Sequence, residues 1–202
     1  MPGVENACFI SYKHPPDAPD GPRVYTHFWT EFIDAFQNRL QSYLTVNPKI
    51  YWDPDLRKVP GSTYPQELSR SLCRSACLIA ILVPEYMEST WCLAEWNAMK
   101  QLATSRTGGK AAPTHIIPVL FRGNKDQAET FVGDHILVDF RHITSPARDL
   151  GAKGNRKTME IIATQIDEAV RRLTDIEPCD NFAIPIGQEL THHAFNDPDP
   201  LV

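Results

Sequence analysis

The sequence lacks any long hydrophobic run. Its longest apolar segment, Ala76 to Val83, stops at Pro84, far short of the ~20 residues that cross a bilayer. The first residues, MPGVENACFISYKH, also lack the cationic and then apolar pattern of a secretory signal. We therefore expect a soluble, cytoplasmic protein with no membrane partner.

An excess of positive charge is missing as well. Lys and Arg number 20 against 25 Asp and Glu, which gives a formal net charge of −5 with no long run of either sign. Proteins that bind polyanions usually carry a basic patch, so nucleic acid is not expected as a partner. The 202 residues, 42% of them hydrophobic, have the composition of one ordinary globular domain.

Paired cysteine motifs are absent. The number of cysteines is odd and no CxxC pair occurs; they are Cys8, Cys73, Cys77, Cys92 and Cys179. Most lie in apolar segments, where a free cysteine packs as a small hydrophobic residue. We predict reduced cysteines and no disulfide framework. His192 and His193 are adjacent in a polar tail and zinc-ligand spacing is missing, so no metal site is expected.

Several motifs that bind phosphate or carry a nucleophile are also lacking. No GxGxxG follows a predicted strand, which argues against a Rossmann dinucleotide site. Residues Gly151 to Thr158 resemble a Walker A loop, but Arg156 replaces its second glycine and no strand precedes it. Ser62 lacks the strand-turn-helix frame of a nucleophile elbow. We interpret the first segment as a helix start and Ser62 as a loop residue.

What is present is an alternation of short apolar runs with segments of helical period, which is typical of a βαβα chain around a parallel sheet. The predicted strands are Ala7 to Tyr12, Lys49 to Trp52, Ala76 to Val83, His115 to Leu120 and His135 to Phe140. The run from Ala76 is apolar on both faces and is therefore expected mid-sheet.

Helical spacing occurs between these strands. Apolar residues recur at intervals of three and four from Tyr25 to Leu44, and this helix should end near Asn47-Pro48. Further helices are predicted at Pro65 to Arg74, from about Ser89 onward, and at Arg156 to Leu173. The pattern of 124–134 is too weak to assign. We divide the chain into a domain over 1–174 and a proline-rich tail or wrapping arm over 175–202.

Ligands of open parallel sheets bind beyond the carboxyl ends of the strands. That edge is predicted to comprise the loops Lys13 to Arg23, Asp53 to Tyr64 and Pro84 to Thr90. We therefore expect any catalytic or ligand-binding site at this edge.

The most informative segment is Ser89 to Leu102, which follows this edge. On a helical wheel, the apolar side is formed by Cys92, Trp96, Met99 and Ala103. Glu95 falls on the shoulder of that face, one turn after Trp91. A carboxylate beside a large aromatic side chain is partly desolvated and can be reactive. The alternative is a glutamate whose stem lies along the core while its head reaches water or a nearby cation.

Three motifs in this order resemble a Toll/interleukin-1 receptor (TIR) domain, and particularly the NAD-consuming TIR proteins of prokaryotes. Phe9-Ile10-Ser11-Tyr12 is similar to the first box of the family, and Trp52-Asp53 through Pro60-Gly61 resembles its second strand and BB loop. Glu88 to Glu95 (ESTWCLAE) resembles its third-helix signature. The similarity runs from about Ala7 to Leu173.

The resemblance implies a flavodoxin-like α/β fold, with a five-stranded parallel sheet of order 2-1-3-4-5 and helices on both faces. It implies an NAD+ glycohydrolase or cyclase, in which Glu95 is catalytic and Trp91 faces the nicotinamide. Tyr12, Lys13 and His14 would help hold NAD+, although His14 departs from the arginine common in some members. NAD+ would be the substrate, with no separate cofactor.

The resemblance also implies an assembly. Lys58, Gly61 and Tyr64 map to the BB loop, which in the family often packs against a neighbouring protomer. Because the chain has no recognisable sensor or effector domain, we expect activation in trans, by self-association or by a separate sensor or effector protein, as in prokaryotic antiviral and immune signalling.

Three other functions fit parts of the sequence. A non-catalytic TIR scaffold that acts through homotypic contacts is the main alternative. A phosphoacceptor receiver domain would use Asp53, but it needs acidic Mg²⁺ ligands directly after the first strand, where this chain has Tyr12-Lys13-His14. A nucleoside-processing glycosyl transferase with a related sheet is the third.

Overall fold

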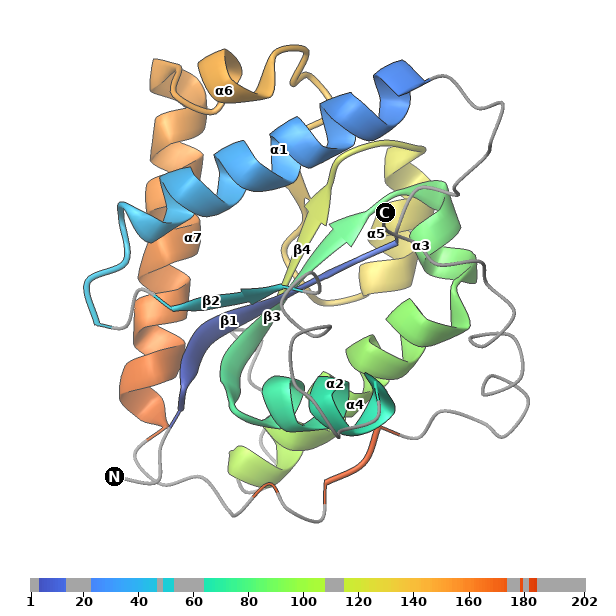
Figure 1. Cartoon of the computed structure of the whole chain (residues 1–202), viewed down its shortest axis with the longest axis vertical. Helices are drawn as coiled ribbons and strands as arrows, with labels where there is room; N and C mark the ends of the chain where they lie inside the picture. The colour runs from blue at the N-terminus through green and yellow to red at the C-terminus, as the bar shows by residue number, and fades with distance from the viewer. Residues whose placement is uncertain are drawn as a thin grey trace.

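The computed structural model describes residues 4–13, 23–46, 49–52, 64–107, 115–173, 179 and 182–184, with the backbone alone at 23–27 and 64. Five strands form one parallel sheet in the order β2-β1-β3-β4-β5 (Figure 1). They are β1 (Asn6–Tyr12), β2 (Ile50–Trp52), β3 (Ser75–Leu82), β4 (Ile116–Leu120) and β5 (Val138–Asp139). The predicted strand order is confirmed.

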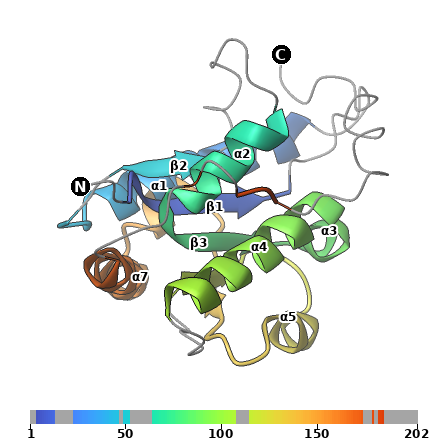
Figure 2. The same cartoon turned by 90° about the horizontal axis from the view of Figure 1, so that it is seen from below.

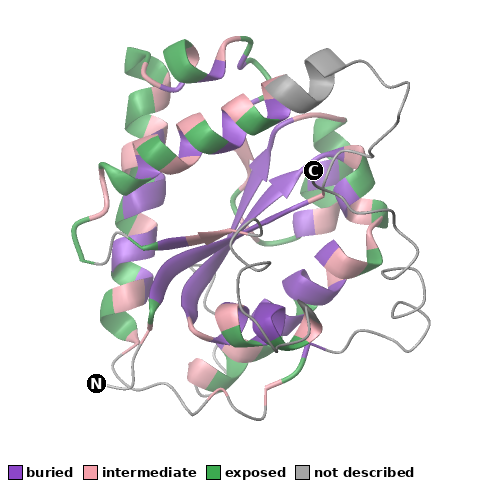
Figure 3. Cartoon of the chain, viewed as in Figure 1, coloured by how far each residue is buried: buried purple, intermediate pink, exposed green. Residues whose placement is uncertain are grey.

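Strand β3 lies in the middle of the sheet, as its doubly apolar sequence predicts. It pairs with β1 on one side and β4 on the other, and all of its residues are buried (Figure 3). A strand covered on both faces needs apolar side chains in both directions. Ser75–Leu82 meets this requirement, because every residue after the initial serine is apolar.

Helices cover both faces of the sheet. They are α1 (Arg23–Gln41), α2 (Tyr64–Cys73), α3 (Pro84–Glu88), α4 (Thr90–Arg106), α5 (Lys125–Val132), α6 (Pro146–Asp149) and α7 (Lys153–Arg172). Helices α1 and α7 contact each other on one side, and α2 and α4 do so on the other. In the view of Figure 2, α2 and α4 lie in front of the sheet and α1 lies behind it.

The structure differs from the predicted elements at four helices. Helix α5 forms in the segment that was too weak to assign. Its N-cap Asn124 accepts a hydrogen bond from the backbone N–H of Asp126 at 2.8 Å, and Gly133 ends it at φ 60°. Two short helices, α3 and α6, each begin with a proline at the first helical positions. The last helix starts at Lys153, earlier than predicted.

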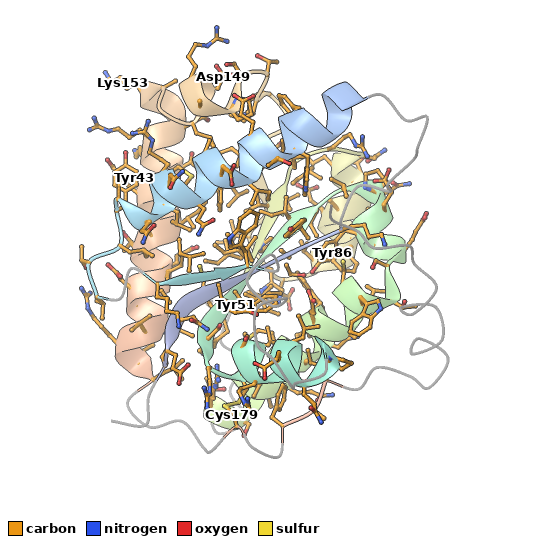
Figure 4. All side chains as sticks on the ribbon, in the orientation of Figure 1. Tyr43, Tyr51, Tyr86, Asp149, Lys153 and Cys179 are labelled. Atoms are coloured by element: carbon orange, nitrogen blue, oxygen red, sulfur yellow. A yellow bond between two sulfur atoms is a disulfide. The ribbon has the colours of Figure 1, made fainter. Side chains whose placement is uncertain are left out.

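A disulfide joins Cys73, the last residue of α2, to Cys179, and this overturns the expectation that all cysteines are reduced. The two positions are 106 residues apart, so nothing local in the sequence indicates the pair. Cys8, Cys77 and Cys92 are free and buried, as predicted. Figure 4 shows Cys179 next to α2.

The described part of the predicted tail packs against the domain. The backbone N–H of Ile184 donates a hydrogen bond to Ser69 Oγ on α2 at 3.0 Å, and Ile184 is itself buried in the core. Phe182 is partly buried against the same core. Within the described residues, no helix is long and apolar enough to cross a membrane.

His115 provides a pH-dependent contribution to stability. It is buried beside β4, and its Nδ1 lies 3.0 Å from the carbonyl oxygen of Ala76. Burial lowers the pKa of this imidazole, so the unfolded chain binds a proton at higher pH than the folded one. The free energy of unfolding should therefore fall as the pH drops below about 6.5.

We expect His115→Gln to reduce this dependence. Urea unfolding at pH 7.5 and 5.5 measures the change in the free energy of unfolding for both proteins, and the loss on acidification should be smaller in the variant. An equal loss in the two proteins would assign the pH dependence to other groups.

Candidate active site

Helix α4 begins at a tight corner directly after α3. Ser89 ends α3, where its N–H donates to the carbonyl of Tyr86 at 3.1 Å, and it also caps α4. Its hydroxyl accepts a hydrogen bond from the backbone N–H of Cys92 at 3.4 Å. This corner brings the first turns of α4 to the carboxyl end of the sheet (Figure 1). The expected loop Pro84 to Thr90 is therefore largely helical.

The apolar face of α4 is broader than the sequence predicts. Cys92, Trp96, Met99 and Ala103 are buried as expected, but Ala94, Glu95 and Ala98 are buried too. The cause is packing on several sides, because α4 contacts α2, α3 and the sheet, and Trp96 lies 5.0 Å from the ring of Phe131 on α5. Glu95 is consequently only 8% exposed, well inside the shoulder position expected of it.

The Glu95 carboxylate is held by residues from other elements. Ser11 Oγ, near the end of β1, donates a hydrogen bond to its Oε2. The same hydroxyl lies 2.9 Å from the phenol oxygen of Tyr86 on α3, and that oxygen lies 3.4 Å from the carbonyl oxygen of Cys92. Figure 4 labels Tyr86 on the α3 side of the sheet. Strand β1, α3 and α4 therefore meet at one buried polar group.

Burial keeps two titratable side chains beside Glu95, those of Tyr86 and Cys92, uncharged. Burial raises the pKa of the Tyr86 phenol well above its usual range, and the charge of Glu95 contributes to this rise. Burial also raises the pKa of the Cys92 thiol to about 12, with Glu95 again contributing and the cation of Lys13 opposing it. At neutral pH the Tyr86 phenol and the Cys92 thiol are therefore both uncharged.

Apart from Tyr12, the other predicted site residues lie partly inside and partly outside the described part of the chain. Trp91 lies on α4 one turn before Glu95 and is half-buried against the core. Lys13 directly follows β1 and is half-buried. Tyr64 begins α2, but its side chain is outside the described residues, as are His14, Lys58 and Gly61 entirely.

The side chain of Tyr12 lies on the opposite face of the sheet from that of Ser11. The Tyr12 ring packs against Trp29 of α1 and Trp52 of β2, at centroid distances of 5.7 and 6.4 Å. Side chains alternate between the faces of a strand, so Ser11 contacts Glu95 while the Tyr12 ring lies on the α1 side. A contact of Tyr12 with substrate stays a prediction.

Ser11 and Tyr86 are the residues that the sequence prediction missed. Both lie inside segments that it singled out, since Ser11 belongs to the Phe9 to Tyr12 motif and Tyr86 to the expected edge loop. The alternation of β1 was an available signal for Ser11, because Tyr12 and Ser11 cannot face the same side. Within the described residues, no group of three or more His, Cys, Asp or Glu side chains could hold a metal ion.

Comparison with known proteins identifies the family of this fold. A family model described as TIR domain matches residues 24–153, well over half of the chain, and includes both Trp91 and Glu95. No curated protein and no solved structure matches the sequence. The family match and the sheet order 2-1-3-4-5 agree, and the chain belongs to the TIR domain family.

Proposed function

We propose that this TIR domain is an NAD+ nucleosidase, which breaks the bond between nicotinamide and ribose. One observation carries the proposal: a carboxylate held by Ser11 lies one helical turn from the half-buried indole of Trp91, at the carboxyl end of a parallel sheet. Ligands of such sheets bind at this edge. A fixed carboxylate there can stabilise positive charge that develops on a sugar.

A single carboxylate is sufficient for this reaction. Most glycosidases need a second carboxyl group, because the leaving oxygen must be protonated. In NAD+ the nicotinamide nitrogen is already cationic, so the electron pair of the breaking bond neutralises it and no acid is required. Glu95 would orient the ribose hydroxyls and stabilise the oxocarbenium-like cation, while Trp91 holds the nicotinamide ring.

The product depends on what captures the cation. Water attacks the anomeric carbon and loses a proton, which yields ADP-ribose. Attack by the adenine or by a ribose hydroxyl of the same molecule yields a cyclic isomer instead. We place this activity in the cytoplasm and in immune or antiviral signalling, following the resemblance to prokaryotic NAD-consuming TIR proteins.

A second function is a TIR scaffold that acts only through homotypic contacts. The burial of Glu95 favours it, because an 8% exposed carboxylate that accepts a hydrogen bond from Ser11 also serves as a purely structural acceptor. The two functions share the fold. They differ in whether NAD+ is consumed.

Release of nicotinamide decides between them. We expect the purified protein to release nicotinamide from NAD+, and its specific activity to rise with protein concentration, since TIR domains self-associate and the predicted contact is the BB loop. Chromatography of the products separates ADP-ribose from cyclic isomers. Absence of nicotinamide under conditions that assemble the protein would support the scaffold, and full activity of a dilute monomer would contradict activation by assembly.

A further inference from the structure

A buried chain of hydroxyl groups ends on Glu95. Ser11 is 1% exposed and Tyr86 is fully buried, so neither hydroxyl has water as its main partner. The contacts run from Tyr86 on α3, through Ser11 on β1, to Glu95 on α4. A buried hydroxyl needs a hydrogen-bond partner. The Tyr86 and Ser11 hydroxyls are partners of each other, and Ser11 is also bonded to Glu95.

The number of protons determines the direction of the chain. A hydroxyl carries one hydrogen. When Glu95 is ionised, Ser11 donates its hydrogen to Oε2, so Tyr86 is the donor in its 2.9 Å contact with Ser11. The carbonyl oxygen of Cys92 is a more distant acceptor for the same phenol, at 3.4 Å. The phenol thus polarises the serine, and the serine donates to a charged oxygen.

This direction favours the ionised form of Glu95. If Glu95 were protonated, its carboxyl hydrogen would go to Ser11, Ser11 would become the donor in the 2.9 Å contact with Tyr86, and the phenol would donate to the Cys92 carbonyl oxygen at 3.4 Å. The reversed chain also lacks a charged acceptor, and hydrogen bonds to charged groups are the stronger ones. Glu95 interacts electrostatically with Tyr86 of α3 and with Cys92 of α4, and Lys13 interacts with Cys92.

We propose that Ser11 and Tyr86 are positioning residues, which hold the Glu95 carboxylate through its Oε2 and keep it ionised for its task. This inference rests on the proposed function, because positioning matters only where the carboxylate has a task. Neither residue is a catalytic residue, since both act through Glu95.

The test replaces the two hydroxyls one at a time. We expect Ser11→Ala to lower kcat for nicotinamide release about tenfold with little change in KM, and to move the acid limb of the pH profile up by about one pH unit. Tyr86→Phe should do the same to a smaller extent, because it acts through Ser11. The matched control is Ser75→Ala, which removes a buried hydroxyl of β3 that donates to the Ser71 carbonyl at 2.7 Å and should leave both measurements unchanged.

A second readout does not depend on turnover. In protein labelled with ¹³C at the glutamate side-chain carbons, the Glu95 signal is assigned by its loss in Glu95→Gln, and its titration midpoint should rise in Ser11→Ala. A raised midpoint in a protein that releases no nicotinamide would refute the proposed function, while showing that the hydroxyls still favour the ionised form of Glu95. An unchanged midpoint in both Ser11→Ala and Tyr86→Phe would overturn the inference. If Ser11→Ala does not fold, Tyr86→Phe decides alone.

Discussion

Replacing Glu95 with glutamine should lower the rate of NAD+ cleavage by about 10²–10³-fold. The glutamine removes the negative charge that would stabilise the ribose cation. It retains a carbonyl oxygen that can accept the hydrogen bond from Ser11, so the buried chain of hydroxyls keeps an acceptor. The measurement is nicotinamide release at saturating NAD+, together with thermal unfolding, whose midpoint should change little.

Glu67 offers a matched control for this variant. It is also 8% exposed, it lies on α2 rather than α4, and it pairs with Arg70 at 3.0 Å. Glu67→Gln therefore removes a carboxylate of equal burial outside the candidate site and should retain turnover. If Glu95→Gln retains it as well, the chemistry lies elsewhere. If only Glu67→Gln loses turnover, the loss comes from damage to the folded structure and not from removal of a catalytic charge.

Breaking the Cys73–Cys179 disulfide should lower the free energy of unfolding by about 2–4 kcal/mol. The bond closes a loop between positions 106 residues apart, and most of its effect comes from restricting the unfolded chain. For a domain of this size, we expect Cys179→Ser to lower Tm by about 5–10 °C. Calorimetry of the wild type and the variant measures the difference.

Reductant provides the control for the disulfide. Dithiothreitol should lower the Tm of the wild type to that of Cys179→Ser and leave the variant unchanged. A titration of thiols in the unfolded, unreduced protein should detect Cys8, Cys77 and Cys92 only, and detection of all the cysteines would contradict the bond. Disulfides persist in oxidising compartments and are reduced by cytoplasmic thiols, so in a cytoplasm this stabilisation depends on the redox state.

Much of the architecture follows from local patterns in the sequence. The apolar run from Ala76 to Val83 identifies the central strand, because a strand covered on both faces can carry few polar side chains. The spacing of α1 and α4 identifies their buried sides, and Trp91 and Glu95 are one turn apart on any helix. These inferences need only the period of a helix or a strand. The weakly patterned α5 escaped them, since its ends are defined by Asn124 and Gly133.

The residues that surround Glu95 could be identified only from the tertiary structure. Ser11 and Glu95 are 84 positions apart, and they meet because β1 pairs beside β3 and the corner at Ser89 turns α4 back onto the sheet. Cys73 and Cys179 meet for the same kind of reason, since Ile184, shortly after Cys179, donates a hydrogen bond to Ser69 of α2. Periodicity describes one element at a time, so it indicates which side of α4 faces inward. Which side chain of a distant strand lies opposite that face depends on packing between elements.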